Sequence, residues 1–170
     1  MSLSRRHLTE ILVRSEARYL TVLPEGFQLQ PGEPVLTHLD VALVEFSDAR
    51  TLYRGRRPIC RSLDGQRSVS DVRRQCPACR DRKYCTPQIR LDLLHDGHPW
   101  RLLLAFTSAR NFARYLALLN ARRLDPTDIR TRLQVRNHGT WGEIAFVYLP
   151  QRTHPGATPP ADQAPQITRP

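Results

Sequence analysis

The sequence predicts a mainly β domain that contains one helix and a cysteine-rich insertion. Apolar and polar residues alternate through several short segments of the 170-residue chain, which is typical of half-buried strands. A segment after Phe106 instead has apolar residues at helical spacing. All four cysteines lie between positions 60 and 85, between the first predicted strands and the rest of the domain.

Composition divides the chain into three parts. Residues 1–34 are expected to form an N-terminal arm and loop, with ILVRSEARYL as a short amphipathic helix or an arm, followed by the Pro- and Gly-rich PEGFQLQPGEP. Residues 35–150 have the pattern of a globular domain, with an insertion at 56–87. Residues 151–170 are rich in proline and lack periodicity, so they are expected to be a disordered tail.

The first strands are predicted on both sides of the cysteines. The run LTHLDVALVEF, residues 36–46, is apolar and β-rich, and residues 51–54 extend a second strand. After the cysteines, QIRLDLLHDG alternates between apolar and polar residues. Asp96-Gly97 favours a tight turn, so WRLLLAF at residues 100–106 is expected to complete a hairpin.

A helix is predicted after this hairpin. Thr107 or Ser108 is the expected N-cap, and Asp125-Pro126 is expected to end the helix. The residues expected on its buried face are Phe112, Tyr115, Leu116 and Leu119. The residues expected on its opposite face are Arg110, Arg114, Ala117 and Ala121.

A last hairpin joins IRTRLQV to TWGEIAFVYL through the turn RNHG. In its first strand Ile129, Thr131, Leu133 and Val135 are expected to face inward, and arginines alternate with them on the outside. The resulting order is two strands with a large insertion, a third strand, a helix and two more strands. A five-stranded barrel of the oligonucleotide-binding (OB) type, with its helix between strands 3 and 4, has this order.

The chain is strongly basic. It has 26 Lys+Arg against 16 Asp+Glu, a formal net charge of +10, and Lys83 is its one lysine. Arginine binds phosphate oxygens in a forked geometry and stacks on bases. A small domain with this charge is expected to meet a polyanion, although a solvated basic surface or an acidic protein partner would also fit.

The cysteine pattern Cys60-x15-Cys76-x2-Cys79-x5-Cys85 predicts one metal site. Four thiolates complete a tetrahedron around zinc and leave no open position for a catalytic water. The segment between the cysteines has few apolar residues, so a metal would supply its folding energy. A [4Fe–4S] cluster is the alternative, because it also takes four thiolates. The spacing CxxC-x5-C resembles clusters of certain DNA-processing nucleases and helicases, but the chain lacks their catalytic motifs.

Single-stranded nucleic acids are held by positive grooves and by aromatic rings on which bases stack. The cations predicted to bind are Arg56, Arg57, Arg61, Arg73, Arg74, Arg80, Arg82, Lys83, Arg130, Arg132 and Arg136. The aromatic residues predicted to stack are Tyr53, Tyr84, Trp100 and Trp141, among which Trp100 fits the core equally well. No Gly-rich phosphate loop or serine nucleophile elbow is present, so no enzymatic activity is expected.

The segments RRPICRSLDG, CPACRDRKYC, IRLDLL, WRLLLAF, SARNFARYLALL and TRLQV…WGEIAF carry a family likeness. The stretch from Tyr53 to Tyr148 resembles small single-stranded-DNA-binding proteins of phages and mobile elements with an OB-type barrel. The resemblance implies a non-catalytic binder of single strands with little sequence preference, active in phage or mobile-element DNA metabolism.

Two other functions remain open from the sequence. The chain could be a structural or adaptor subunit of a larger nucleoprotein complex, such as an RNA-guided effector or transposition machinery, with the Pro-rich tail contacting a protein partner. It could also be an iron–sulfur accessory factor of a nuclease or helicase. No apolar run is long enough to span a membrane, and no secretory signal is recognised, so a cytoplasmic location is expected.

Overall fold

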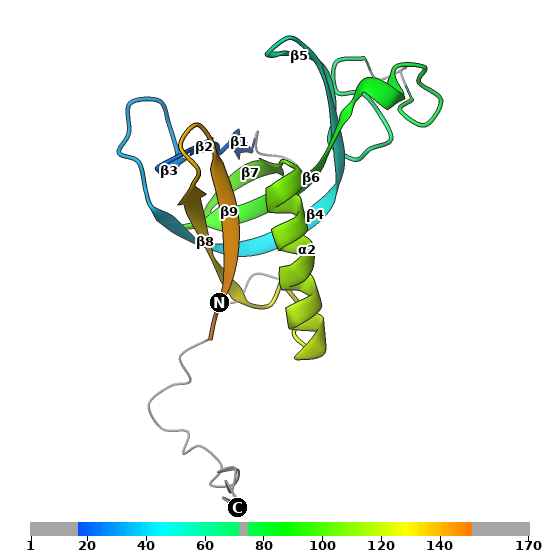
Figure 1. The fold of residues 1–170 in the computed structure, drawn as a ribbon. Helices are drawn as coiled ribbons and strands as arrows, with labels where there is room; N and C mark the ends of the chain where they lie inside the picture. The colour runs from blue at the N-terminus through cyan, green and yellow to red at the C-terminus, as the bar shows by residue number, and fades with distance from the viewer. Residues whose placement is uncertain (1–16, 72–74, 151–170) are drawn as a thin grey trace, which may run out of the picture.

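Residues 17–71 and 75–150 are described by a computed structural model, shown as a ribbon in Figure 1. Its elements, in chain order, are β1 (Arg18–Tyr19), β2 (Thr21–Leu23), β3 (Gly26–Gln28), β4 (His38–Arg54), β5 (Arg57–Ser62), the 3₁₀ helix η1 (Arg82–Tyr84), β6 (Thr86–His95), β7 (His98–Leu104), α2 (Phe106–Ala121), β8 (Arg130–Asn137) and β9 (Gly142–Leu149). The mainly β composition and the position of the helix confirm the sequence prediction.

Seven strands form one mixed sheet in the order β1-β7-β6-β4-β8-β9, with β5 paired to β4 off this path. β1 pairs with β7 in parallel, and the other pairings are antiparallel. Strands β2 and β3 form a separate small hairpin. The sheet curls around the core, and α2 lies along the side where β9 ends the sheet (Figure 1).

Strand β4 organises the sheet because it contacts three other strands. It pairs with β6 from Ala42 to Thr51, with β8 at its beginning and with β5 at its end. A bulge between Leu43 and Glu45 shifts the register within it. The two strands predicted at 36–46 and 51–54 are therefore one strand of 17 residues, which bends at the bulge instead of ending.

The core lies on the inner face of the curled sheet. Alternate residues of β6 and β8 point into it, as the sequence alternation predicted. The side chains that lie in it with less than 2% exposure are Phe27, Phe112, Leu39, Leu43, Leu91, Leu93, Leu102, Leu104, Leu119, Leu133 and Val41. The hairpin predicted at Asp96-Gly97 forms, and both of these residues have the positive φ that this turn requires.

The five-stranded barrel is not confirmed, because the sheet is open. Within the described residues no pairing joins β7 to β9, the two strands that a closed barrel would bring together. The outer edge of β7 is paired instead with β1. The β2–β3 hairpin packs near β8 and β9, where the backbone oxygen of Leu23 lies beside Gly142. Short strands of two or three residues carry too little alternation to be predicted from sequence.

Part of the segment predicted as an arm belongs to the folded domain. Leu20 and Phe27, 7% and 0% exposed, lie in the main core cluster. The backbone N–H of Leu20 donates to the Arg101 oxygen at 2.9 Å, which extends the β1–β7 pairing. Residues 1–16, which include most of the candidate amphipathic helix, and the tail at 151–170 lie outside the described residues.

Helix α2 buries Phe112, Tyr115 and Leu119, as predicted, but its ends differ from the prediction. The N-cap position is Ala105, because the chain enters the helix directly from β7. The Ser108 hydroxyl accepts a hydrogen bond from the backbone N–H of Ile144 at 3.0 Å, so it joins the helix to β9. The helix ends before Asp125-Pro126, at a positive-φ turn on Arg123.

Candidate metal centre and nucleic-acid interface

The four cysteines come from three separate pieces of backbone. Cys60 lies on β5, opposite Leu52 of β4. Cys76 follows an antiparallel bridge between Arg67 and Gln75, and Cys79 follows it by three residues. Cys85 comes immediately after η1 and before β6. The sheet therefore anchors the first and last cysteines, and a loop carries the middle pair.

Successive turns shape the loop between Cys76 and Cys85. The Cys76 N–H donates to the Gln66 oxygen at 2.7 Å, which fixes the start of the loop. The Cys79 N–H donates to the Cys76 oxygen at 3.2 Å, and the Cys85 N–H donates to the Arg82 oxygen at 3.1 Å. Such turns between paired cysteines are compatible with zinc ligation by two thiolates.

Two polar side chains support the other half of the insertion. The Asp64 carboxylate accepts hydrogen bonds from the backbone N–H groups of Gln66 and Arg67 and from the Ser62 hydroxyl. These bonds, with the one from Arg67 the strongest cause, lower the pKa of Asp64 below its ordinary value. Ser68 accepts from two backbone N–H groups and lies 3.3 Å from the Cys60 sulfur.

The four cysteine side chains line one small cavity of about 10 Å³, which is about the room that one water occupies. Arg50, Leu52, Asp81 and Arg82 complete its wall. All four cysteines are free of disulfides. As placed, however, the described His, Cys, Asp and Glu side chains include no group of three or more that could hold a metal ion. The donor set thus fits a tetrathiolate site, but its spacing is not that of a completed one.

The electrostatics of the cavity reflect the closeness of the thiols. Burial raises the pKa of the Cys85 thiol, and Cys60, Cys79 and Cys76 raise it further because negative charges in one place repel. Arg50 acts in the opposite direction. Arginines at the wall of a thiolate cavity would offset part of the negative charge of a bound tetrathiolate ion.

The part of the insertion between β5 and β6, residues 63–85, has almost no interior of its own in its described residues. Among its described residues, 63–71 and 75–85, Ser68 alone is buried. The loop therefore lacks the apolar burial that stabilises the rest of the domain. Its shape depends on the turns just described, on its two attachments to the sheet, and on whatever the four thiols bind.

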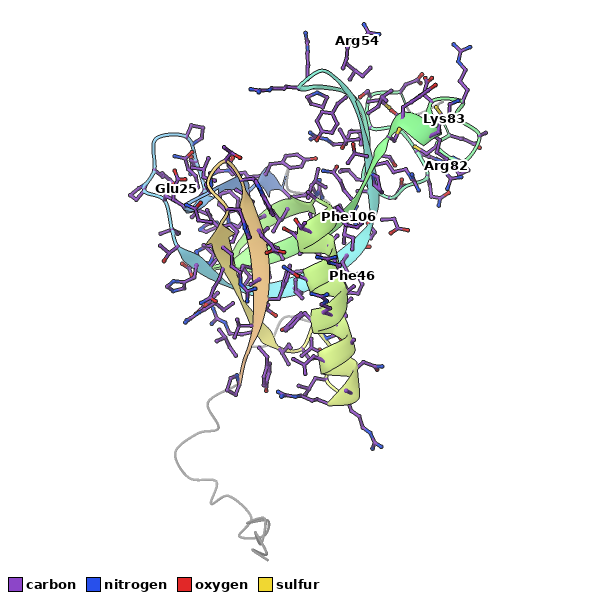
Figure 2. The ribbon with its side chains drawn as sticks, viewed as in Figure 1. Glu25, Phe46, Arg54, Arg82, Lys83 and Phe106 are labelled. Atoms are coloured by element: carbon purple, nitrogen blue, oxygen red, sulfur yellow. The ribbon has the colours of Figure 1, made fainter. Side chains whose placement is uncertain are left out.

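Exposed cations surround this loop. Figure 2 shows Arg54 at the end of the β4–β5 hairpin, and Arg82 and Lys83 on η1 at the outer part of the loop. The predicted cations that the structure leaves exposed in this region are Arg56, Arg57, Arg80, Arg82 and Lys83. Arg61 is half-buried, and Arg73 and Arg74 lie outside the described residues.

Three of the four predicted aromatic residues are accessible. Tyr84 is 66% exposed, and the Lys83 ammonium lies 5.0 Å from its ring centroid. Tyr53, 41% exposed, lies on the β4–β5 hairpin. Trp141, 44% exposed, stacks on His138 in the β8–β9 turn, with centroids 4.3 Å apart.

Trp100 is not accessible in this way. Its side chain is 5% exposed and belongs to the main core cluster, so the prediction that its ring stacks on bases is corrected. The residue points inward because side chains alternate along β7, so that Trp100 and Arg101 face opposite ways. Its register partner on β6, Leu93, also points into the core.

The three predicted arginines of β8 have different roles. Arg132 forms a forked ion pair with Asp40 of β4, with nitrogen–oxygen distances of 2.6 and 2.8 Å. This hydrogen bond lowers the pKa of Asp40, and Arg132 is not the free cation that the sequence suggested. Arg130 and Arg136 are exposed, but they lie near opposite ends of β8. Only Arg136 is close to the Trp141 turn.

Sequence reasoning did not single out Tyr19, an exposed aromatic residue that lies beside two arginines. Tyr19, 43% exposed, sits on β1 with two guanidinium groups near its ring, Arg61 at 5.1 Å and Arg101 at 6.0 Å from the centroid. Its position depends on the parallel pairing of a two-residue strand with β7. The motif RY alone carries no signal of that pairing.

The exposed features lie mainly at one end of the molecule. Figure 1 shows the β8–β9 turn, β1, the β4–β5 hairpin and the cysteine loop toward the same end, away from the last residues of β9. The long strand β4 causes this arrangement, because it extends past β8 to carry β5 and the insertion.

No family model, curated protein or solved structure matches this chain. The likeness to phage and mobile-element proteins therefore remains an expectation. Separately, no helix within the described residues is long and apolar enough to cross a membrane.

Proposed function

We propose that this protein binds single-stranded nucleic acid, with DNA favoured over RNA, and has no catalytic activity. The observation that carries the proposal is the surface formed by the β4–β5 hairpin and the cysteine loop. Exposed arginines there accompany the accessible rings of Tyr53 and Tyr84. Phosphate oxygens would meet the guanidinium groups, and bases would stack on the rings.

The strand order supports an open version of the OB arrangement. The five long strands, in chain order, are β4, β6, β7, β8 and β9. Across the sheet they lie in the order β7-β6-β4-β8-β9, so the first strand in the chain lies between the second and the fourth. The helix lies between the third and fourth strands. In OB folds the loops joining strands 1–2 and 4–5 contact oligonucleotides. The cysteine insertion and the Trp141 turn occupy these two positions.

We further propose that Cys60, Cys76, Cys79 and Cys85 hold one structural zinc ion. The shared cavity, the four free thiols and the absence of an apolar interior in the described part of the loop support this role. We favour a single zinc ion over a [4Fe–4S] cluster because the sequence carries none of the nuclease or helicase motifs that accompany such clusters. The loop would close slightly around the ion, since the thiols as placed are not yet a ligand group.

A tetrathiolate zinc ion supplies stability and no reaction step, because all four positions are filled. The chain's own residues would then do the binding. The loop would hold its cations at fixed positions, and a fixed array binds a phosphate backbone at less entropic cost than a mobile one.

The test measures binding and metal content on the same purified protein. Fluorescence anisotropy with labelled oligo-dT and oligo-U, repeated over a salt series, should show binding that weakens steeply as salt rises. Elemental analysis should find one zinc per chain, in a colourless protein. Absence of binding to either oligonucleotide at low salt would overturn the proposal. If the protein instead copurified with a stoichiometric partner and bound no free strand, an adaptor role would replace it.

A further inference from the structure

Tyr19 joins three separately placed elements on the outer face of the sheet. Its register partner on β7 is Arg101, so the two side chains lie on the same face of the sheet. Arg61 reaches the same ring from β5, immediately after the cysteine ligand candidate Cys60. Residues 19, 61 and 101 thus meet at one place although they are distant in sequence.

The two arginines are held in different ways. Arg101 donates from Nε to the Asp92 carboxylate at 2.8 Å, and Asp92 is only 4% exposed. This ion pair fixes the guanidinium of Arg101 against the sheet. The Nε atom of Arg61, in contrast, is buried and has no hydrogen-bond partner within the described residues. Because that atom is enclosed, a ligand oxygen would meet Arg61 at the terminal nitrogens of its guanidinium group.

The ring itself is preorganised. Guanidinium groups at 5.1 and 6.0 Å from the centroid restrict its motion through cation–π attraction. The residue is 43% exposed, so part of its surface is accessible to a ligand. An aromatic surface held beside arginines matches the chemistry of a nucleotide, which offers a flat base and an anionic phosphate.

We infer that one nucleotide of the single strand binds to Tyr19, Arg61 and Arg101, between the cysteine loop and the body of the sheet. A base stacks on the open surface of Tyr19, and the adjoining phosphodiester accepts hydrogen bonds from Arg61. Arg101 positions the ring and adds positive charge. The inference rests on the proposed function, since it names the residues that receive one nucleotide of that strand.

The competing interpretation is that Tyr19 merely anchors the β4–β5 hairpin to β1. Stability and affinity separate the two. An anchor predicts that Tyr19→Ala lowers the melting temperature and leaves the affinity of the folded protein for oligo-dT unchanged. A stacking site predicts weaker binding by a protein that is still folded.

The experiment compares oligo-dT binding by the full chain and by four variants over a salt series, and compares their affinities at the lowest salt concentration. Tyr19→Ala should weaken binding by roughly 5- to 150-fold, the equivalent of one lost stack, and Tyr19→Phe should bind like the unchanged protein. Arg61→Gln should lower the steepness of the salt dependence by about 0.7 in log–log units, for one lost phosphate contact. Arg18→Gln is the matched control, because Arg18 is exposed on the same strand with its side chain on the opposite face.

A second readout does not depend on affinity. Photocrosslinking to an oligonucleotide that carries 5-iodouracil, followed by mass spectrometry, should identify Tyr19 among the crosslinked residues. If the unchanged protein binds no strand, the proposed function fails. If it binds, but Tyr19→Ala matches Arg18→Gln in affinity and no crosslink forms at Tyr19, the inference fails while the proposed function stands.

Discussion

At the scale of single residues, buried polar contacts set how the helix lies on the sheet. The Tyr115 hydroxyl and the Thr131 hydroxyl are 2.8 Å apart, and Thr131 is completely buried. Burial also raises the pKa of Tyr115, so the hydroxyl stays protonated and available for this bond. The contact fixes α2 against β8, whose opposite face carries Arg130 and Arg132.

Removing one partner of this pair should destabilise the domain. Tyr115→Phe leaves the Thr131 hydroxyl buried without its partner, so we expect a loss of about 1–3 kcal/mol in the free energy of unfolding. Urea denaturation followed by circular dichroism measures it. The double variant Tyr115→Phe/Thr131→Val should recover most of the loss, because neither polar group then remains. A double variant less stable than Tyr115→Phe would contradict this account.

Gly142 permits a close approach between β9 and the N-terminal hairpin. A Cβ atom there would lie 2.6 Å from a Val135 methyl group and 2.8 Å from the Leu23 oxygen. Gly142→Ala should therefore lower the free energy of unfolding by about 1–3 kcal/mol through overpacking. Thr140→Ala, an exposed change in the same turn, is the control and should have little effect on thermal unfolding.

Residue roles were predictable from sequence where a periodic pattern fixed the direction of the side chain. The alternation of β8 and the helical spacing of Phe112, Tyr115 and Leu119 are such cases. Trp100 was ambiguous because it begins an apolar strand, and only the packing of that strand places it in the core. The ion pair between Arg132 and Asp40 joins residues 92 positions apart, which no local pattern reveals.

At the scale of elements, the cysteine insertion contrasts with the rest of the domain. The sheet and helix are held by apolar burial, while the described part of the insertion is held by turns and by polar side chains such as Asp64. Elements that lack a core open at low energetic cost. The turn at Asp64 is therefore expected to open when its carboxylate is protonated.

Acid should loosen this turn. The folded pKa of Asp64 lies below its ordinary value of 3.8, so its carboxylate stabilises the turn above that pH. The stabilisation is lost as pH falls through the folded pKa, once the carboxyl group is protonated. Hydrogen exchange at the Gln66 and Arg67 amides, corrected for intrinsic rates, should lose protection over this range.

Asp64→Asn should give reduced protection at those two amides already at neutral pH, because a neutral amide oxygen is a weaker acceptor than a carboxylate. Glu25→Gln, an exposed change on a distant loop, is the control and should leave the protection unchanged. Unaltered exchange at Gln66 and Arg67 in Asp64→Asn would show that the carboxylate does not hold the turn.

The long elements were predictable from sequence, and the short ones were not. The hairpin of β6 and β7, the helix and the hairpin of β8 and β9 all carry clear periodicity. The continuity of β4 was missed because polar residues around Ser47 interrupt the apolar pattern. In the structure the Ser47 hydroxyl donates to the Leu63 oxygen, so a polar residue faces the insertion without ending the strand.

At the scale of the whole molecule, the domain combines a stable body with a basic insertion of little intrinsic stability. The body keeps its core independently of the cysteines, none of which is in a core cluster. The insertion carries most of the exposed cations that we propose to contact the strand. Metal binding should therefore control binding activity more than it controls global folding.

Metal removal tests this division. A zinc chelator should make the insertion sensitive to trypsin, with cleavage at Arg80, Arg82 or Lys83, while the β-sheet signal in circular dichroism persists. Cys76→Ser should show the same sensitivity without chelator, and added zinc should restore resistance only in the unchanged protein. Equal cleavage rates with and without chelator would contradict a structural metal.

The most direct test of the central claim is a salt titration of oligo-dT binding by the zinc-loaded full chain. We expect the logarithm of the association constant to fall linearly with the logarithm of salt concentration, with a slope steeper than about −2. Such a slope corresponds to three or more phosphate contacts at about −0.7 each. No measurable binding at low salt, or a slope near zero, would contradict the assignment of the basic hairpin and cysteine loop as a nucleic-acid interface.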